Sequence, residues 1–164
     1  MSSLLPALRG IVNAHEPVPG LATGGQPGEA TLAALKAAGC EVLLDIRDPM
    51  ERRPLRVPDA VTAAGLEYVN VPVGHGGVTP ATFAKVRETV KRLVDAGRPT
   101  YFHCGSGNRV GAMMIPYLML DRGMSEDDAV EEAMRIGTRS AELVELALEY
   151  VRSQAGGAST DASR

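Results

Sequence analysis

Short apolar runs alternate with amphipathic segments through most of this chain, and the spacing of the apolar residues distinguishes the two. The longer segments place apolar residues three or four positions apart, as one face of a helix requires. Residues 79–96 show this spacing clearly, with Phe83, Val86 and Val90 on one face. The expected strands are 40–46, 66–71 and 99–103, and the expected helices are 31–38, 59–64, 79–96, 109–120, one that begins at 125 and a last one that ends near 153.

This order of elements predicts an α/β fold with a central, mostly parallel sheet flanked by helices, because parallel strands are usually joined by crossover helices. In such sheets, ligands bind beyond the carboxyl ends of the strands. Three loops follow the predicted strands, at 47–57, 72–78 and 104–109. We expect these loops to meet at one rim of the sheet and to form the functional site.

The chain of 164 residues is expected to form one domain. Residues 1–20 are interpreted as an N-terminal lead-in, because prolines interrupt them. Residues 21–153 are interpreted as the catalytic domain. The small and polar residues at 154–164 predict a disordered tail.

Composition and charge exclude several classes of function. The net charge is −3 and aromatic residues make up only 4% of the chain, so neither a basic surface nor a stacking platform for nucleic acid is expected. The N-terminus lacks the pattern of a signal peptide, and no stretch approaches the roughly 18 apolar residues of a membrane span. We therefore expect a cytoplasmic protein that binds neither nucleic acid nor membranes. The sequence indicates no oligomeric state.

The strongest candidate for chemistry is Cys104, one of two cysteines. The other, Cys40, is interpreted as a small buried apolar residue. Cys104 follows a strand directly and begins a glycine-containing loop that leads into a helix, where backbone N–H groups and the helix dipole favour a thiolate. Arg109 at the end of this loop has the planar guanidinium that holds a tetrahedral oxyanion. The pattern predicts nucleophilic displacement at phosphorus or sulfur.

Several segments occur in the order seen in the β-lactamase-hydrolase-like phosphatases, a bacterial branch similar to dual-specificity and tyrosine phosphatases. These segments are Gly25-Gln26-Pro27, 42–47 with Glu51, 64–73 and 103–111. The resemblance implies a protein-tyrosine-phosphatase-like fold that hydrolyses phosphate monoesters in a phosphorylated protein or small molecule. It also implies a phosphocysteine intermediate on Cys104, with no metal and no cofactor. The residues that would hold the phosphate are Gly105, Ser106, Gly107, Asn108 and Arg109.

The chain departs from the general tyrosine-phosphatase pattern in three places. Four residues rather than five separate Cys104 from Arg109, and Val110 replaces the usual serine or threonine. The aspartic acid that the family uses as general acid is absent from the loop at 72–78. His75 lies in that loop and is the predicted general acid, because imidazole can protonate a leaving group near neutral pH. An ordinary exposed histidine is the alternative interpretation.

Other charged residues near the predicted rim keep two interpretations each. Asp48 and Asp59 are further candidates for the general acid, with solvation or helix capping as the alternative. His103 either orients the catalytic loop or forms a hydrogen bond inside the core. The loop at 47–57 also carries arginines that suit a phosphorylated substrate or form a solvated face. These are Arg47, Arg52, Arg53 and Arg56.

A rhodanese-like sulfurtransferase is the main alternative function. Asp45-Ile46-Arg47 is similar to the Asp-x-Arg segment of rhodaneses, whose active-site loop has the same short spacing. Such an enzyme would carry a persulfide on Cys104. A third interpretation is a domain that binds phosphorylated partners without turnover. The Gly-His-Ile-Pro-Gly-Ala segment of rhodaneses is absent, and the order of the segments favours the phosphatase.

Overall fold

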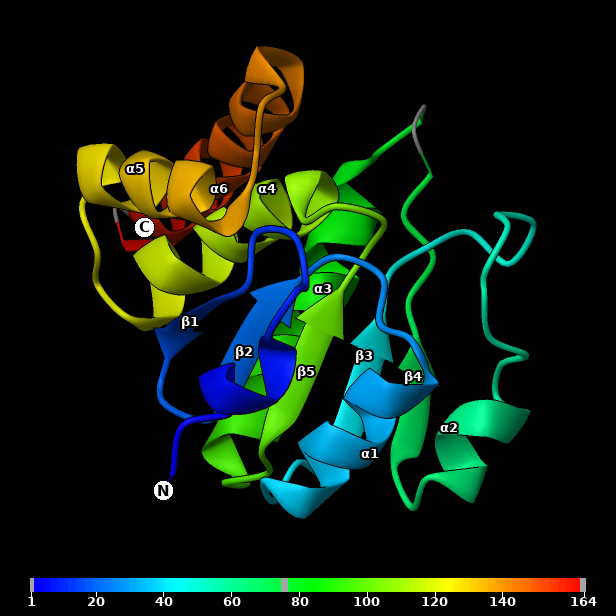
Figure 1. Cartoon of the computed structure of the whole chain (residues 1–164). Helices are drawn as coiled ribbons and strands as arrows, with labels where there is room; N and C mark the ends of the chain where they lie inside the picture. The colour runs from blue at the N-terminus through cyan, green and yellow to red at the C-terminus, as the bar shows by residue number, and fades with distance from the viewer. Residues whose placement is uncertain (1, 75–76, 163–164) are drawn as a thin grey trace.

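Figure 1 shows the arrangement of the chain in a computed structural model, which describes residues 2–74 and 77–162. In this part of the chain, five strands form one sheet in the order β1-β2-β5-β3-β4. The strands are β1 (His15–Val18), β2 (Leu21–Gly24), β3 (Val42–Asp45), β4 (Glu67–Asn70) and β5 (Thr100–His103). The helices are η1 (Leu5–Leu8), α1 (Glu29–Ala37), α2 (Asp59–Ala63), α3 (Pro80–Asp95), α4 (Asn108–Pro116), η2 (Tyr117–Asp121), α5 (Glu126–Ile136) and α6 (Ala141–Ala162).

The central part of the sheet is parallel, as the alternation of strands and helices predicts. β5 lies between β2 and β3 and is parallel to both, and β4 is parallel to β3. β3, β4 and β5 correspond to the three strands expected from the sequence. The predicted α/β fold with a mostly parallel sheet is therefore confirmed.

The sequence did not predict β1 and β2, and residues 1–20 are more than a lead-in. Leu4 and Leu8 are 0% and 2% exposed and belong to an apolar cluster on the sheet. β1 pairs antiparallel with β2 and so adds an edge strand. Its sequence contains Pro17, which is found in sheets at edge strands and which conceals the strand pattern.

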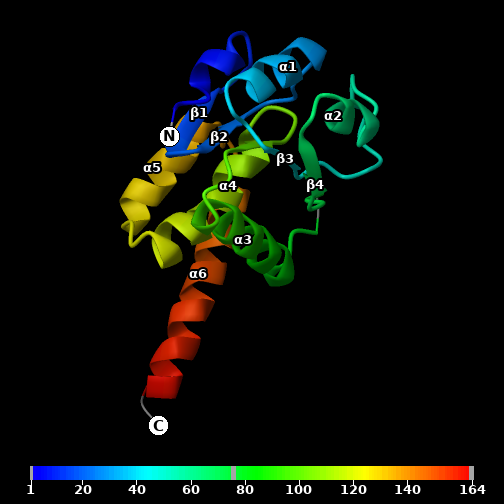
Figure 2. The same ribbon diagram turned by 90° about the horizontal axis from the view of Figure 1, so that it is seen from below.

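The helices cover both faces of the sheet and bury two separate apolar clusters. On one face, η1, α1 and α2 enclose strand residues such as Leu43 and Tyr101. On the other face, α3, α4, α5 and α6 enclose Leu44 and Phe102. Neighbouring strand residues point to opposite clusters because side chains alternate along a strand. Figure 2 shows the two groups of helices on either side of the strands.

α4 is the most enclosed helix, and every residue from Arg109 to Pro116 is buried. Gly111 allows α5 to pack closely, because a Cβ atom at this position would lie 2.4 Å from the Ala133 carbonyl oxygen. The sequence predicts a disturbance of the helix at Pro116. In the structure the helix changes there from α to π geometry at η2, since proline lacks the N–H that would donate to the Ala112 carbonyl oxygen in the preceding turn.

α6 continues to Ala162, beyond the end near 153 that the sequence predicts. The sequence interpretation placed a disordered tail at 154–164, whereas the backbone of 154–162 is helical. No proline interrupts this segment, and its helix continues through Gly156 and Gly157, which are poor helix formers. Among residues 2–74 and 77–162, no helix combines the length and the apolar character that crossing a membrane requires.

Candidate active site

The loops after β3, β4 and β5 meet at one rim, as the parallel sheet requires. Asp45, at the end of β3, pairs in register with Asn70 on one side and His103 on the other. Two of the loops are joined directly, because Arg109 Nη1 donates a hydrogen bond to the Val73 carbonyl oxygen at 2.9 Å. The predicted convergence of the loops is therefore observed.

Cys104 lies at the base of the loop that connects β5 to α4, and it is 1% exposed. Its Sγ accepts a hydrogen bond of 3.1 Å from the Gly107 N–H. Gly107 caps α4 in a left-handed conformation, with φ of +96°. A Cβ atom there would also lie 2.7 Å from the Ile136 carbonyl oxygen, so both backbone and packing require glycine.

The predicted Gly25-Gln26-Pro27 segment supports the outer side of the Cys104 loop. The Gln26 N–H donates to the Gly105 carbonyl oxygen at 3.0 Å. A Cβ atom on Gly25 would lie 2.8 Å from the same oxygen, so the close approach depends on glycine. Tyr101 completes this support, because its hydroxyl donates to the Gly25 carbonyl oxygen at 2.6 Å.

Arg109 is held in one orientation by Glu51. Its Nη1 and Nη2 donate to the two carboxylate oxygens of Glu51 at 2.7 and 2.8 Å, which is a bidentate pair. Burial opposes the charge of Arg109, but Glu51 and the sulfur of Cys104 favour it more strongly, and the pKa of the guanidinium is raised. The hydrogen bond from Arg109 lowers the pKa of Glu51 to about 2. Both groups are therefore charged at neutral pH.

Glu51 is the functional residue that sequence reasoning underrated. It belongs to the phosphatase-like pattern, but nothing else in the sequence distinguishes it from the other charged residues of its loop. Its partner Arg109 is 58 positions away, so no local spacing reveals the pair. The convergence of the loops at 47–57 and 104–109 was the one signal that could have indicated it.

The predicted basic rim is only partly available to a substrate. Arg47 is only 8% exposed, and its guanidinium donates hydrogen bonds to the side chain of Gln26 and to the Arg52 carbonyl oxygen. Arg53 pairs with the buried Asp45 at 3.0 Å. These two arginines hold the loop together, whereas Arg52 and Arg56 are exposed.

His103 is a structural residue of the loop rather than a group that faces solvent. It is buried, its Nδ1 lies 3.1 Å from the Cys104 carbonyl oxygen, and its ring stacks on Tyr101 with centroids 5.6 Å apart. Burial lowers the pKa of His103, so the ring is neutral at physiological pH. Of the two interpretations, the structure supports orientation of the loop.

The candidates for the general acid have different outcomes. His75 lies outside the described residues. Asp48 accepts a hydrogen bond from the Met50 N–H at 2.9 Å and so stabilises the turn of its own loop. Asp59 lies in the first turn of α2, where an acidic side chain complements the helix dipole. The N-cap of α2 is Pro58 and no side chain donates or accepts a capping hydrogen bond, so Asp59 contributes through its charge and not as a cap.

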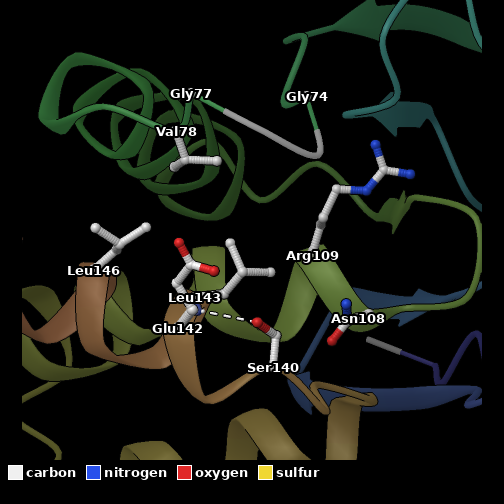
Figure 3. Close-up of a pocket in the computed structure, with 9 residues that line it drawn as sticks. All are labelled: Gly74, Gly77, Val78, Asn108, Arg109, Ser140, Glu142, Leu143 and Leu146. Atoms are coloured by element: carbon white, nitrogen blue, oxygen red, sulfur yellow. Dashed lines mark hydrogen bonds between the residues drawn. The ribbon is translucent and has the colours of Figure 1, made fainter.

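A cavity of about 140 Å³ lies beside the first turn of α4 and shares Asn108 and Arg109 with the Cys104 loop. Figure 3 shows aliphatic side chains on the side away from Arg109, with the carboxylate of Glu142 next to them. The lining residues are Gly74, Gly77, Val78, Asn108, Arg109, Ser140, Glu142, Leu143 and Leu146.

Over the described residues of the chain, histidine, cysteine and carboxylate side chains form no group of three that could hold a metal.

Solved structures of several phosphatases have this fold. The DUF442 phosphatase from Shewanella putrefaciens CN-32 superposes with a TM-score of 0.77 at 20% identity, over 91% of this chain and 97% of that one. PTPMT1 gives 0.74 at 20% identity, over 90% and 99% of the two chains. The catalytic core of the PP-IP phosphatase SIW14 from S. cerevisiae gives 0.72 at 17% identity, over 93% and 94%. The fold is that of protein-tyrosine-phosphatase-like enzymes.

Sequence comparison identifies the family. The profile of the DSP-PTPase phosphatases fused to NAD+ kinase matches residues 12–153, which is most of the chain. The chain belongs to this family and is a dual-specificity-like phosphatase, so the resemblance to dual-specificity phosphatases is confirmed. No curated protein sequence matches the chain significantly.

Replacing Glu51 with glutamine should weaken the fold and change its response to pH. The pKa of Glu51 is lowered from 4.5 to about 2 in the folded protein. Its charge therefore stabilises the fold above about pH 4.5, and this stabilisation is lost as the pH falls toward about 2. Urea denaturation should show that Glu51→Gln lowers the free energy of unfolding by about 2 kcal/mol at neutral pH and by less at about pH 3.

The matched control is Glu67→Gln, because Glu67 forms a half-exposed ion pair with Arg98 at 2.6 Å. This variant should keep the pH dependence of the wild type, since exposed pairs contribute little. If Glu51→Gln lowered the free energy of unfolding equally at both pH values, the role assigned to the ion pair between Glu51 and Arg109 would be contradicted.

Proposed function

We propose that this protein hydrolyses phosphate monoesters through a covalent phosphocysteine intermediate on Cys104. The observation that carries the proposal is the 3.1 Å hydrogen bond from the Gly107 N–H to Cys104 Sγ at the start of α4. This bond and the helix dipole stabilise a negatively charged sulfur. Arg109 lies beside the sulfur and attracts the phosphate. The family match supports phosphatase chemistry.

The proposed reaction consists of two displacements at phosphorus. In the first, Cys104 Sγ bonds to phosphorus, the bond to the ester oxygen breaks, and the leaving alcohol receives a proton from a general acid. In the second, a water oxygen bonds to phosphorus and the sulfur–phosphorus bond breaks. Inorganic phosphate leaves, the water proton passes to the base form of the same acid, and the thiolate is restored.

The Cys104 loop would stabilise the charge of the phosphoryl group in both steps. We assign the backbone N–H groups of Gly105, Ser106, Gly107 and Asn108 to its non-bridging oxygens. Arg109 would add two parallel donors, since a guanidinium matches the geometry of phosphate. Glu51 keeps Arg109 in place but would not itself touch the substrate.

Hydrolysis of p-nitrophenyl phosphate by purified variants tests the nucleophile. Cys104→Ser should lower kcat at least about a thousandfold, because a hydroxyl replaces the attacking thiolate. Cys40→Ser is the matched control: burial raises the pKa of Cys40 to about 11, and this thiol lies in the other apolar cluster, so kcat should stay within about twofold of the wild type. Chelators should leave the rate unchanged.

Equal activity in the wild type and Cys104→Ser would reject the phosphocysteine mechanism. Transfer of sulfur from thiosulfate to cyanide, without phosphatase activity, would support the rhodanese-like alternative that the loop length permits. Phosphate binding without either reaction would indicate a domain that only recognises phosphorylated partners.

We also propose His75 as the general acid, from its place in the loop at 72–78. Removing a general acid slows the hydrolysis of an ester with a poor leaving group strongly, because that group must be protonated as it departs. It has much less effect on an ester whose leaving group departs unprotonated. His75→Gln should therefore lower kcat/KM, which reports the first displacement, about a hundredfold for phenyl phosphate and only a few-fold for p-nitrophenyl phosphate. Asp48→Asn is the comparison variant and should affect both esters equally. If the two variants showed the same ratio of rates for phenyl phosphate and p-nitrophenyl phosphate, His75 would be rejected as the general acid.

The cavity beside α4 supports a proposal about the leaving group of the substrate. The wall away from Arg109 is aliphatic, and the rest of the lining is largely polar. Among the described lining residues the charged ones are Arg109, which is paired with Glu51, and Glu142. We propose that the natural substrate, a phosphorylated protein or small molecule, presents an aliphatic, uncharged or cationic group here. A second phosphate would be repelled by Glu142.

Reversing the charge of Glu142 tests this preference. Glu142→Lys should raise kcat/KM about three- to tenfold for fructose 1,6-bisphosphate relative to 2-aminoethyl phosphate, as expected for one charge at a solvated site. Glu149→Lys makes the same charge change on α6 outside the cavity and should leave the ratio unchanged. Equal shifts in both variants would show that only net charge matters.

A further inference from the structure

We propose that Asn13 is a positioning residue, which holds a peptide of the Cys104 loop with its N–H directed at the nucleophile. The inference rests on the proposed function of that loop. Asn13 precedes β1 and lies far from Cys104 in the sequence, outside every motif recognised in the chain. Its role follows from one hydrogen bond, one unusual backbone conformation and two neighbouring glycines.

The hydrogen bond joins Asn13 to the peptide that contacts the sulfur. Asn13 Nδ2 donates to the Ser106 carbonyl oxygen at 2.8 Å. The N–H of the same peptide belongs to Gly107 and donates to Cys104 Sγ at 3.1 Å. In a planar trans peptide the C=O and N–H bonds point in opposite directions. Fixing the carbonyl outward therefore fixes the N–H inward.

The backbone of Asn13 is in the left-handed region, with φ of +57°. It is the one non-glycine residue with positive φ in 2–74 and 77–162. This conformation is costly for most residues and is best tolerated by asparagine, aspartate and glycine. Such strain persists where the surrounding structure holds it, and it often marks a functional constraint.

Gly137 makes room for the Asn13 side chain, and Gly107 lies within contact distance of it. A Cβ atom on Gly137, after α5, would lie 2.9 Å from Asn13 Nδ2. A Cβ atom on Gly107 would lie 3.5 Å from Asn13 Cβ. The amide therefore sits between the Cys104 loop and the end of α5, and its donor has little freedom to turn away from Ser106.

The segment that carries Asn13 is itself anchored on both sides. Before it, the Val12 carbonyl oxygen accepts a hydrogen bond of 3.1 Å from the Gly25 N–H. After it, His15 Nε2 lies 2.5 Å from a carboxylate oxygen of Glu132 on α5. The preceding peptide of the loop is also turned outward, because the Gly105 carbonyl oxygen accepts from Gln26. Asn13 supplies the corresponding bond for the next peptide through a side chain, which can be replaced.

Asn13→Gly tests the hydrogen bond alone, because glycine accepts the left-handed backbone and lacks the amide. Two readouts need no turnover: the Kd for orthovanadate by calorimetry, and the rate of Cys104 alkylation by iodoacetamide at about pH 6, in a Cys40→Ser background. We expect an approximately five- to tenfold weaker affinity and a several-fold slower alkylation. The Tm should fall by no more than a few degrees.

Asn13→Asp separates positioning from simple packing. Aspartate keeps the size and the left-handed preference but places an acceptor against the Ser106 carbonyl oxygen, so its affinity for vanadate should be lower than that of Asn13→Gly. Asn13→Ser offers a hydroxyl donor and should recover some of the affinity. Wild-type affinity and alkylation in Asn13→Gly would overturn the proposal. The proposal would also be overturned if, in all three variants, the losses of vanadate affinity and of alkylation rate simply paralleled the loss of Tm.

The same data distinguish the inference from the proposed function. A wild type that binds vanadate through Asn13 but does not hydrolyse p-nitrophenyl phosphate would refute the function and support the positioning role. A wild type that hydrolyses the ester while Asn13→Gly is unaffected in both readouts would refute only the positioning role.

Discussion

The bidentate pair between Arg109 and Glu51 constrains the whole rim of the sheet. A guanidinium whose residue is only 4% exposed must find acceptors inside the protein, since an unpaired buried charge costs several kcal/mol. Glu51 provides two acceptors and Val73 a third, and these come from the loops after β3 and β4. The charge of Arg109 thus requires that three loops, each following a different strand, meet at one place.

Asp45 has a similar role beneath the rim, at the end of β3. Its carboxylate is buried and accepts hydrogen bonds from the Arg47 N–H at 2.8 Å, from Arg53 Nε at 3.0 Å and from the Tyr68 hydroxyl at 2.7 Å. Burial and the hydrogen bond to Asp45 raise the pKa of Tyr68, so the hydroxyl remains a donor. Arg53 faces inward because the buried carboxylate of Asp45 needs a partner. The sequence shows the charge of this arginine but not its direction.

The sequence predicted features that depend on neighbouring residues, but not contacts between residues that lie far apart in the chain. β3 lies in an apolar run, and β4 and β5 are rich in the aromatic and β-branched residues that strands favour. The sequence locates Cys104 and Arg109 because they flank one loop between a strand and a helix. β1 was missed because Pro17 and polar residues hide its pattern, and β2 because it has only two apolar residues, follows Gly20 and ends at Gly24. The partnership of Glu51 with Arg109 was missed for a different reason: residues far apart in the chain become neighbours only when the sheet forms.

The support of the Cys104 loop also determines how the fold and the activity are coupled. Asn13 precedes β1, Gln26 follows β2, Glu51 follows β3, and the loop itself leads into the buried α4. No supersecondary unit of the chain contains both the nucleophile and its supports. The geometry of the anion-binding loop therefore depends on contacts that exist only in the complete fold. An isolated fragment, or a partly folded intermediate with a complete α4, would carry the cysteine without the chemistry.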